Sequence, residues 1–310
     1  MPPEVGATRL DDHVLVVVVL ALGAAVVYGA SDFLGAFAAR RIDLVTATLF
    51  NYAVAAVLIV VAVLIVGGAW STGAFWSGVT CGALAVFGLL AFYGVLAIGP
   101  MSLLSPLIAL IQSIVPVAIA AATGQGLSVV GWIAIGIGVV ALVLLAPAPQ
   151  RGRQHISLRA GLLAVASGLL LGASLIVLDF APKDSGVIPA MWEIVTGTVI
   201  LAIVWLVLRA IGTQRPGLSF LKPSADAVRT LSARRAWLAA AASGVLVAFA
   251  DTFIVLALHL GNLAVVSVLT SLYPVLTVIL AATVLKERMT KLQFVAVGLV
   301  IAASLLFSAS

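Results

Sequence analysis

A chain of 310 residues with 64% hydrophobic and 9% charged residues has too little polar surface to cover a water-soluble body of its size. Its net charge of +5 is carried by few residues, and the basic residues do not form an aromatic-interleaved patch, so nucleic acid is not an expected partner. The expected solvent for most of this chain is a lipid bilayer.

Apolar stretches of membrane-spanning length recur along the chain, separated by short polar breaks. A bilayer core of about 30 Å needs roughly 20 helical residues to cross it. The apolar runs are continuous and do not alternate with period two, which favours helices over barrel strands. We therefore predict an all-α integral membrane protein with ten transmembrane helices. The predicted spans are residues 14–38, 43–66, 75–98, 101–122, 128–147, 157–180, 187–209, 236–260, 263–285 and 291–309.

The predicted spans divide into two sets of five. After a tail of residues 1–13, the first repeat covers residues 14–147, a linker covers 148–156, and the second repeat covers 157–310 with a basic loop at 209–235. Two sets of five helices must cross the membrane in opposite directions, because five is odd. The sequence thus predicts two inverted repeats, an arrangement found in transporters that work by alternating access.

Two internal echoes support a duplication. Residues 99–144 lie over residues 261–306 without gaps at an offset of 162, which matches Gly99 with Gly261. In the first and sixth spans, Gly29-Ala30-Ser31 lies over Gly172-Ala173-Ser174. Apolar helices match easily by chance, so the order of helices, breaks and prolines carries more of this argument than the identities do.

The orientation follows from the positions of Lys and Arg, since translocating cationic loops is disfavoured. Apart from Arg9 and Lys183, the basic residues all fall in the breaks that follow odd-numbered spans. If the chain has ten spans, both termini face away from the cytoplasm.

Ionisable residues inside apolar spans are the best functional clue, because each costs about 2.5–3.5 kcal/mol at the centre of a membrane helix. The predicted spans contain Asp32, Asp179, Glu193, Asp251 and His259, and no mid-span Lys or Arg. Such an acidic set suits amines, the ammonium group of amino acids, or protons. Asp179 and His259 lie near span ends, where structural roles are favoured.

Asp32 is the first candidate for a binding residue. Tyr28, Ser31, Asp32 and Gly35 share one helical face by their spacing, which combines an aromatic wall, a hydroxyl group, a carboxylate and space for a ligand. The alternative is that Asp32 forms a snorkelling ion pair with Arg40-Arg41 at the cytoplasmic end of its helix.

Asp251 lies in the middle of the eighth span, which favours substrate binding or proton coupling over a headgroup contact. Glu193 lies closer to a span end, beside Trp192, and an interfacial carboxylate is the alternative there. Other polar residues either line a pocket or bond between helices: Asn51, Tyr93, Gln112 and Tyr273. Gln112 and Tyr273 gain weight from nearby prolines, which free backbone carbonyl groups.

Three segments make the chain resemble the EamA-type ten-helix members of the drug/metabolite transporter superfamily. They are Tyr28-Gly29-Ala30-Ser31, the stretch from Leu269 to Val275, and Lys286-Glu287-Arg288-Met289-Thr290 followed by Gln293 and Gly298. The last segment is the most specific. The first repeat departs from the pattern, because its corresponding turn reads Gly124-Gln125-Gly126 without the charged pair.

This resemblance implies a basket of ten helices around a central cavity. The first, third, fourth, sixth, eighth and ninth helices would line the cavity, and the fifth and tenth would stack outside it. The resemblance also implies transport without ATP, and the sequence has no Walker pattern.

The sequence reading is therefore a secondary transporter of small organic metabolites such as amino acids or amphipathic drugs, an exporter in the cell inner (cytoplasmic) membrane, driven by protons. An uncoupled facilitator is the alternative. A membrane scaffold ranks lower, because it has no use for buried acids that are costly to insert into the membrane. An intramembrane enzyme also ranks lower, because the three histidines are too scattered to bind a catalytic zinc ion. We expect no cofactor and no metal. The expected partners are a small-molecule substrate, protons and membrane lipids, with a monomer or a weak homo-oligomer.

Overall fold

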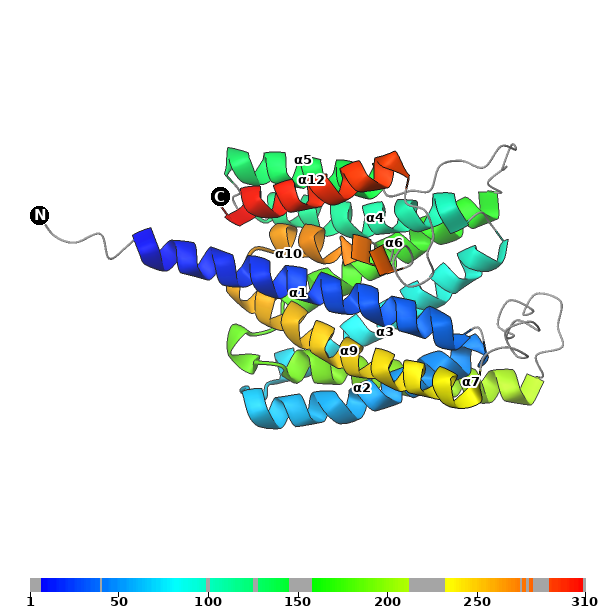
Figure 1. Ribbon diagram of the computed structural model, residues 1–310. Coiled ribbons are helices and arrows are strands. Elements are labelled where there is room, and N and C mark those ends of the chain that lie inside the picture. The colour runs from blue at the N-terminus through cyan, green and yellow to red at the C-terminus, as the bar shows by residue number, and fades with distance from the viewer. Residues whose placement is uncertain are drawn as a thin grey trace, which may run out of the picture.

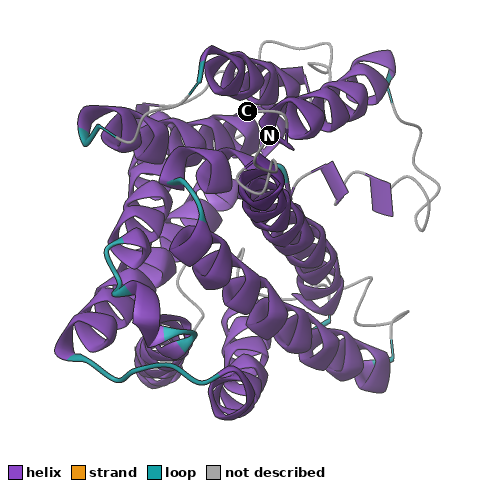
Figure 2. Ribbon diagram, turned by 90° about the vertical axis from the view of Figure 1, so that its left-hand side faces the viewer, coloured by secondary structure: helices purple, strands orange, loops and turns teal. Residues whose placement is uncertain are grey.

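A computed structural model shows helices joined by short loops throughout its described part, with no strand there (Figure 2). It describes residues 7–39, 41–98, 101–124, 128–144, 158–211, 232–273, 275–276, 279–280 and 290–308. The predicted all-α class is confirmed. The Lys286–Met289 pattern, Pro274, the linker 148–156 and most of the basic loop lie outside the described residues.

Ten α-helices occupy the described residues, and their ends fall within a few residues of most predicted spans (Figure 1). The helices are α1 (Ala7–Ala39), α2 (Leu44–Val66), α3 (Thr72–Ile98), α4 (Met101–Ala122), α5 (Val129–Leu144), α6 (Leu158–Asp179), α7 (Ile188–Ile211), α9 (Ala233–Leu260), α10 (Leu263–Thr270) and α12 (Lys291–Ser308). A short 3₁₀ helix, η1 (Lys183–Ser185), lies between α6 and α7.

Side-chain caps fix the starts of several helices. The Asp43 carboxylate accepts a hydrogen bond from the backbone N–H of Thr46 at the start of α2. Ser232 caps α9 in the same way, and the Asn262 side chain accepts from Ala264 at the start of α10. These caps satisfy backbone donors that the first helical turn leaves free, so α2, α9 and α10 begin where the polar breaks of the sequence end.

α10 differs from its predicted span. We expected one helix over residues 263–285, but α10 ends at Thr270, with Ser271 as its C-cap. Leu272 donates to the carbonyl oxygen of Leu269, a tighter turn than that of an α-helix. Helical geometry is found again at Tyr273, Val275, Leu276, Ile279 and Leu280, so the helix is interrupted at Ser271 and Leu272 within the described part of this span.

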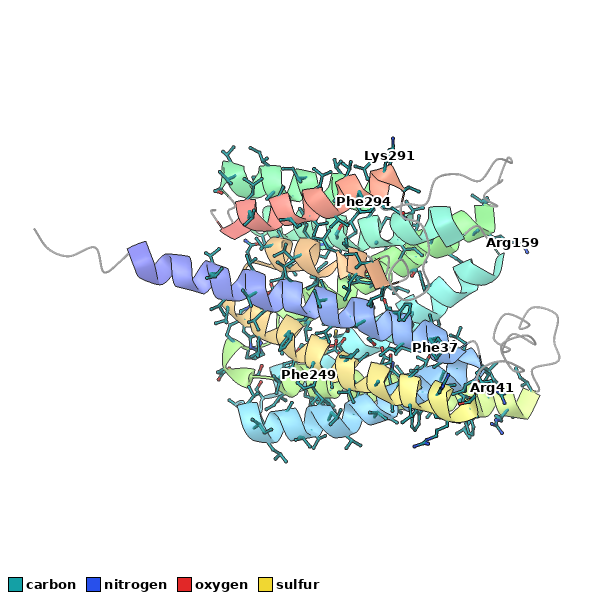
Figure 3. The ribbon with its side chains drawn as sticks, in the orientation of Figure 1. Phe37, Arg41, Arg159, Phe249, Lys291 and Phe294 are labelled. Atoms are coloured by element: carbon teal, nitrogen blue, oxygen red, sulfur yellow. The ribbon has the colours of Figure 1, made fainter. Side chains whose placement is uncertain are left out.

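Six of the described helices are long and apolar enough to cross a membrane: α1, α2, α3, α6, α7 and α9. α4, α5 and α12 contain shorter apolar segments. Large apolar side chains are exposed along several helices, including Phe249 on α9 and Phe294 on α12 (Figure 3). Water-soluble proteins rarely expose apolar surface on this scale, whereas lipid chains cover it favourably. The structure is that of a multi-pass membrane protein.

The two halves of the chain exchange one helix each. α9 packs against α1 and α2, and α3 packs against α6 and α7. The contact of α10 with α1 likewise corresponds to the contact of α4 with α6. Three further contacts join helices of the same rank in the two halves: α2 with α7, α4 with α10, and α5 with α12. These contacts therefore correspond when α1, α2, α3, α4 and α5 are exchanged for α6, α7, α9, α10 and α12, in that order.

The labelled basic residues gather toward one end of the bundle. Arg41 and Arg159 lie at the right-hand end in Figure 3, and Lys291 lies at the end of α12 nearer to them. α1 begins, and α12 ends, toward the opposite side (Figure 1). This arrangement gives the bundle one basic end, the property that the positive-inside rule reads as the cytoplasmic side.

Candidate functional site

The polar centre of the bundle joins α1 to α9. The Tyr28 hydroxyl on α1 donates a hydrogen bond to Oδ1 of Asp251 on α9, across 223 residues of sequence. Asp251 is only 4% exposed, and Thr252 beside it bonds back to the carbonyl oxygen of Ala248 in its own helix. Two residues that the sequence singled out separately thus form one pair in the interior.

Glu193 on α7 brings a second carboxyl group to this centre. It interacts electrostatically with Asp251 and with Tyr28. The thiol of Cys81 on α3 interacts with the Glu193 carboxyl group and with the Ser174 hydroxyl on α6. Oε2 of Glu193 is buried and has no hydrogen-bond partner. A buried acceptor without a partner costs about 1–3 kcal/mol, so this oxygen needs a functional or structural reason.

Ser31 forms hydrogen bonds between helices. Its Oγ donates to the backbone oxygen of Ser243 on α9, 3.1 Å away, and Oγ of Ser243 donates to the backbone oxygen of Ser31, 2.9 Å away. Both serines are buried, at 2% and 1% exposure. The side-chain amide of Asn51 on α2 also donates to Oγ of Ser243. Ser243 therefore joins α9 to both α1 and α2.

Asp32 is separated from this face. Its residue is exposed, although it lies well inside the predicted first span. Consecutive helical residues point about 100° apart, so the turn that directs Ser31 to α9 directs Asp32 elsewhere. Asp32 interacts electrostatically with Tyr273, which follows α10. The structure thus divides the predicted Tyr28, Ser31 and Asp32 face between two polar places.

The remaining predicted residues are Trp192, Gln112 and Tyr93. Trp192 packs edge-to-face on Phe75, with ring centroids 4.7 Å apart, and its indole nitrogen is buried without a hydrogen-bond partner. Oε1 of Gln112 on α4 is also buried without a partner. Tyr93 lies on α3, and its side chain is outside the described part.

Sequence reasoning missed the residues that join Ser31 and Glu193 to their neighbours. Neither Ser243 nor Cys81 is among the residues that the sequence pattern indicated. One signal was available, because Cys81-Gly82 and Ser243-Gly244 are small polar and glycine pairs separated by the same 162 residues that relate the two halves. Within the described residues, no group of three His, Cys, Asp or Glu side chains could hold a metal ion.

The helical fold, its apolar surface and the buried polar centre define the class of this chain, a multi-pass helical membrane protein. Residues 158–309 match the model of the EamA-like transporter family. The chain therefore carries an EamA-like transporter domain in its C-terminal half.

The fold itself recurs among solved structures. One crystal structure aligns over 93% of this chain and 95% of its own, with a TM-score of 0.70 and 16% sequence identity. At that identity the likeness concerns the fold alone. No match was found among the curated proteins.

Proposed function

We propose that this chain is a secondary transporter that exports small organic solutes across the cytoplasmic membrane in exchange for protons. The observation that carries the proposal is the buried group of Asp251, Tyr28 and Glu193, in which two carboxyl groups from α9 and α7 interact electrostatically. Intramembrane acids are costly and mark substrate or proton pathways. The EamA-like domain supports the transport of small solutes.

Within this proposal the acids divide the work. Asp251 and Asp32 alternate between holding a proton and holding the cationic group of a substrate, such as the ammonium of an amino acid or an amine. Tyr28 positions the Asp251 carboxylate, and Glu193 adds a second carboxyl group that can hold a proton while Asp251 is charged. Tyr273 and Gln112 offer polar groups to the uncharged part of the solute.

The proposed architecture is ten transmembrane helices in two inverted repeats, residues 14–147 and 157–310, with both termini outside the cytoplasm. The corresponding packing partners of the two halves and the single basic end of the bundle support it. A chain that contains both repeats has its pseudo-dimer within one molecule, and we propose a monomer as the working unit.

The function is tested by reconstituting the purified protein into liposomes and measuring uptake of labelled amino acids, amines and nucleosides, with and without an imposed pH gradient. The proposal expects accumulation of a cationic or zwitterionic solute only when the gradient is present. Equilibration without accumulation would replace proton exchange by facilitated diffusion. Failure to move any solute would refute the transporter assignment.

The orientation is tested separately with single cysteines placed at Arg41 and at Leu64, near opposite ends of α2. In intact cells a membrane-impermeant maleimide is expected to label the cysteine at position 64 and to spare the one at position 41. The opposite pattern would invert the proposed topology without touching the transport assignment.

A further inference from the structure

Two polar helix junctions occur in this bundle, and they correspond residue by residue. The first junction joins α1, α2 and α9 through Ser31, Asn51 and Ser243. The second joins α6, α7 and α3 through Ser174, Glu193 and Cys81. Ser31 and Ser174 are the last residues of the Gly-Ala-Ser echo, and Ser243 and Cys81 are related by the offset of 162. In each junction a small central side chain, Ser243 or Cys81, interacts with one partner on either side, and for Ser243 both interactions are hydrogen bonds.

Glycines bring the helix backbones together at both junctions. A side chain at Gly244 on α9 would collide with the backbone oxygen of Asn51, and a side chain at Gly82 on α3 would collide with the backbone oxygen of Glu193. Gly82 and Gly244 are again 162 residues apart. Helices this close cannot slide past each other without a steric clash. Densely packed interiors change between discrete arrangements and do not deform continuously.

An aromatic pair closes each junction. Phe50 on α2 and Trp237 on α9 pack edge-to-face with ring centroids 4.8 Å apart at 82°. Phe75 on α3 and Trp192 on α7 do the same at 4.7 Å and 78°. The four residues occupy corresponding positions, since Trp237 follows Phe75 by 162 residues and Trp192 precedes Glu193 as Phe50 precedes Asn51.

The junctions lie on opposite sides of the membrane centre. Asn51 follows the start of α2 at the basic end of the bundle, and Glu193 follows the start of α7 at the other end. The two groups of helices also contact each other, through side chains of α2 and α7. An example is the hydrogen bond of 2.9 Å from the indole nitrogen of Trp205 on α7 to Oγ1 of Thr46 on α2.

We propose that both junctions are rigid, and that the bodies which move against each other are α1–α2–α9 and α3–α6–α7 rather than the two halves of the sequence. Each half contributes its third helix to the other body, so the boundary of motion runs through both repeats. Asn51 and Glu193 are positioning residues in this scheme. The inference rests on the proposed transport function for its purpose, but not for its geometry.

Cross-linking within and between the bodies tests the proposal, in a Cys81→Ser background that leaves no other thiol. Phe50→Cys with Trp237→Cys places two cysteines within one body, and Thr46→Cys with Trp205→Cys places two across the boundary. Positions 46 and 50 are one turn apart on α2, so the pairs are closely matched. A short bis-methanethiosulfonate is expected to leave the uptake rate of the first pair unchanged and to abolish that of the second until reductant is added. Loss of uptake in the first pair overturns the proposal, as does full uptake in the second.

Spin labels give a readout that does not depend on transport. In the same background, labels at Leu64 on α2 and Leu260 on α9 report on one body, while labels at Leu64 and at Trp76 on α3 report across the boundary; all three residues are exposed. We expect one narrow distance for the first pair and a broad or divided distribution for the second. A first pair as broad as the second, or two narrow distances, overturns the proposal. A protein that moves no solute refutes the transport function, and the measured distances still test whether the two junctions are rigid.

Discussion

The Tyr28 hydroxyl donates its hydrogen bond to the Asp251 carboxylate where α1 and α9 cross, in the apolar interior of the bundle. A phenol and a carboxylic acid are matched partners there, because the carboxylate has few other donors to replace water. The pair therefore separates two properties that experiments can distinguish: the geometry of the crossing, and the charge that Asp251 brings to it.

Replacing Asp251 by Asn keeps an oxygen that accepts the Tyr28 hydrogen bond and removes the carboxylate. We expect gradient-driven uptake to fall by roughly a hundredfold, the low end of the loss that follows removal of a proton-transfer group. The thermal midpoint of the purified protein should change little. Asp184→Asn, on the exposed η1 turn, is the matched control and should keep full uptake. An Asp251→Asn protein with normal gradient-driven uptake would exclude Asp251 from proton coupling.

Glycine substitutions test the close helix contacts. Gly82→Ala and Gly244→Ala each force a methyl group against the backbone of a neighbouring helix, and overpacking of this kind costs about 1–3 kcal/mol. Gly136→Ala and Gly298→Ala are the controls, because nothing lies within 4 Å of the added carbon there. Since alanine favours a helix over glycine by about 0.5–1 kcal/mol, the controls should raise the thermal midpoint slightly. Equal midpoints in all four variants would contradict the packing described for the two junctions.

Ser243→Ala tests the hydrogen bonds of the first junction. The substitution leaves the Asn51 amide and the backbone oxygen of Ser31 without their partner, and we expect a loss of about 1–3 kcal/mol in thermal unfolding measurements. Ser113→Ala is the control, because within the described residues this buried serine donates its hydrogen bond to Leu110 of its own helix. Its loss should be about 1 kcal/mol or less. A larger loss at Ser113 would count against a special role for Ser243.

Cys81 offers a prediction about reactivity. Its side chain is 1% exposed, and a thiol without access to solvent reacts slowly. A water-soluble maleimide should therefore label the folded protein poorly and the denatured protein completely. Cys81→Ser places at the second junction the residue that stands at the corresponding position of the first, so the variant should fold and keep its thermal midpoint. Rapid labelling of the native protein would show that the second junction opens.

Helix positions could be predicted from the sequence because one physical rule decides them: a continuous apolar run must satisfy its own backbone in lipid. α2 and α7 follow that rule within two residues at each end. α10 departs from it, because the helix is interrupted at Ser271 and Leu272 while the apolar run continues. Local backbone chemistry overrides the pattern there.

The site was harder to predict, because pairs such as Tyr28 with Asp251 depend on which helices meet. Spacing along α1 correctly places Tyr28 and Ser31 on one side, but it cannot say that α9 covers that side and leaves Asp32 exposed. The hydrogen bonds of Ser243 to α1 and α2 could not be predicted for the same reason. A serine among alanines and glycines looks like a packing residue until its partner across the crossing is known.

The exchange of α3 and α9 between the halves also constrains how this protein can be made. When the first five helices have left the ribosome, α3 still lacks α6 and α7, the helices that cover its glycine-rich face. The first half therefore remains in the membrane with the packing surface of α3 uncovered until α6 and α7 are made. The second half in turn needs α1 and α2 as the packing partners of α9. Neither gene half should yield a stable product alone, while the two expressed together should assemble. A chain whose helices are exchanged in this way is thus bound into one folding unit.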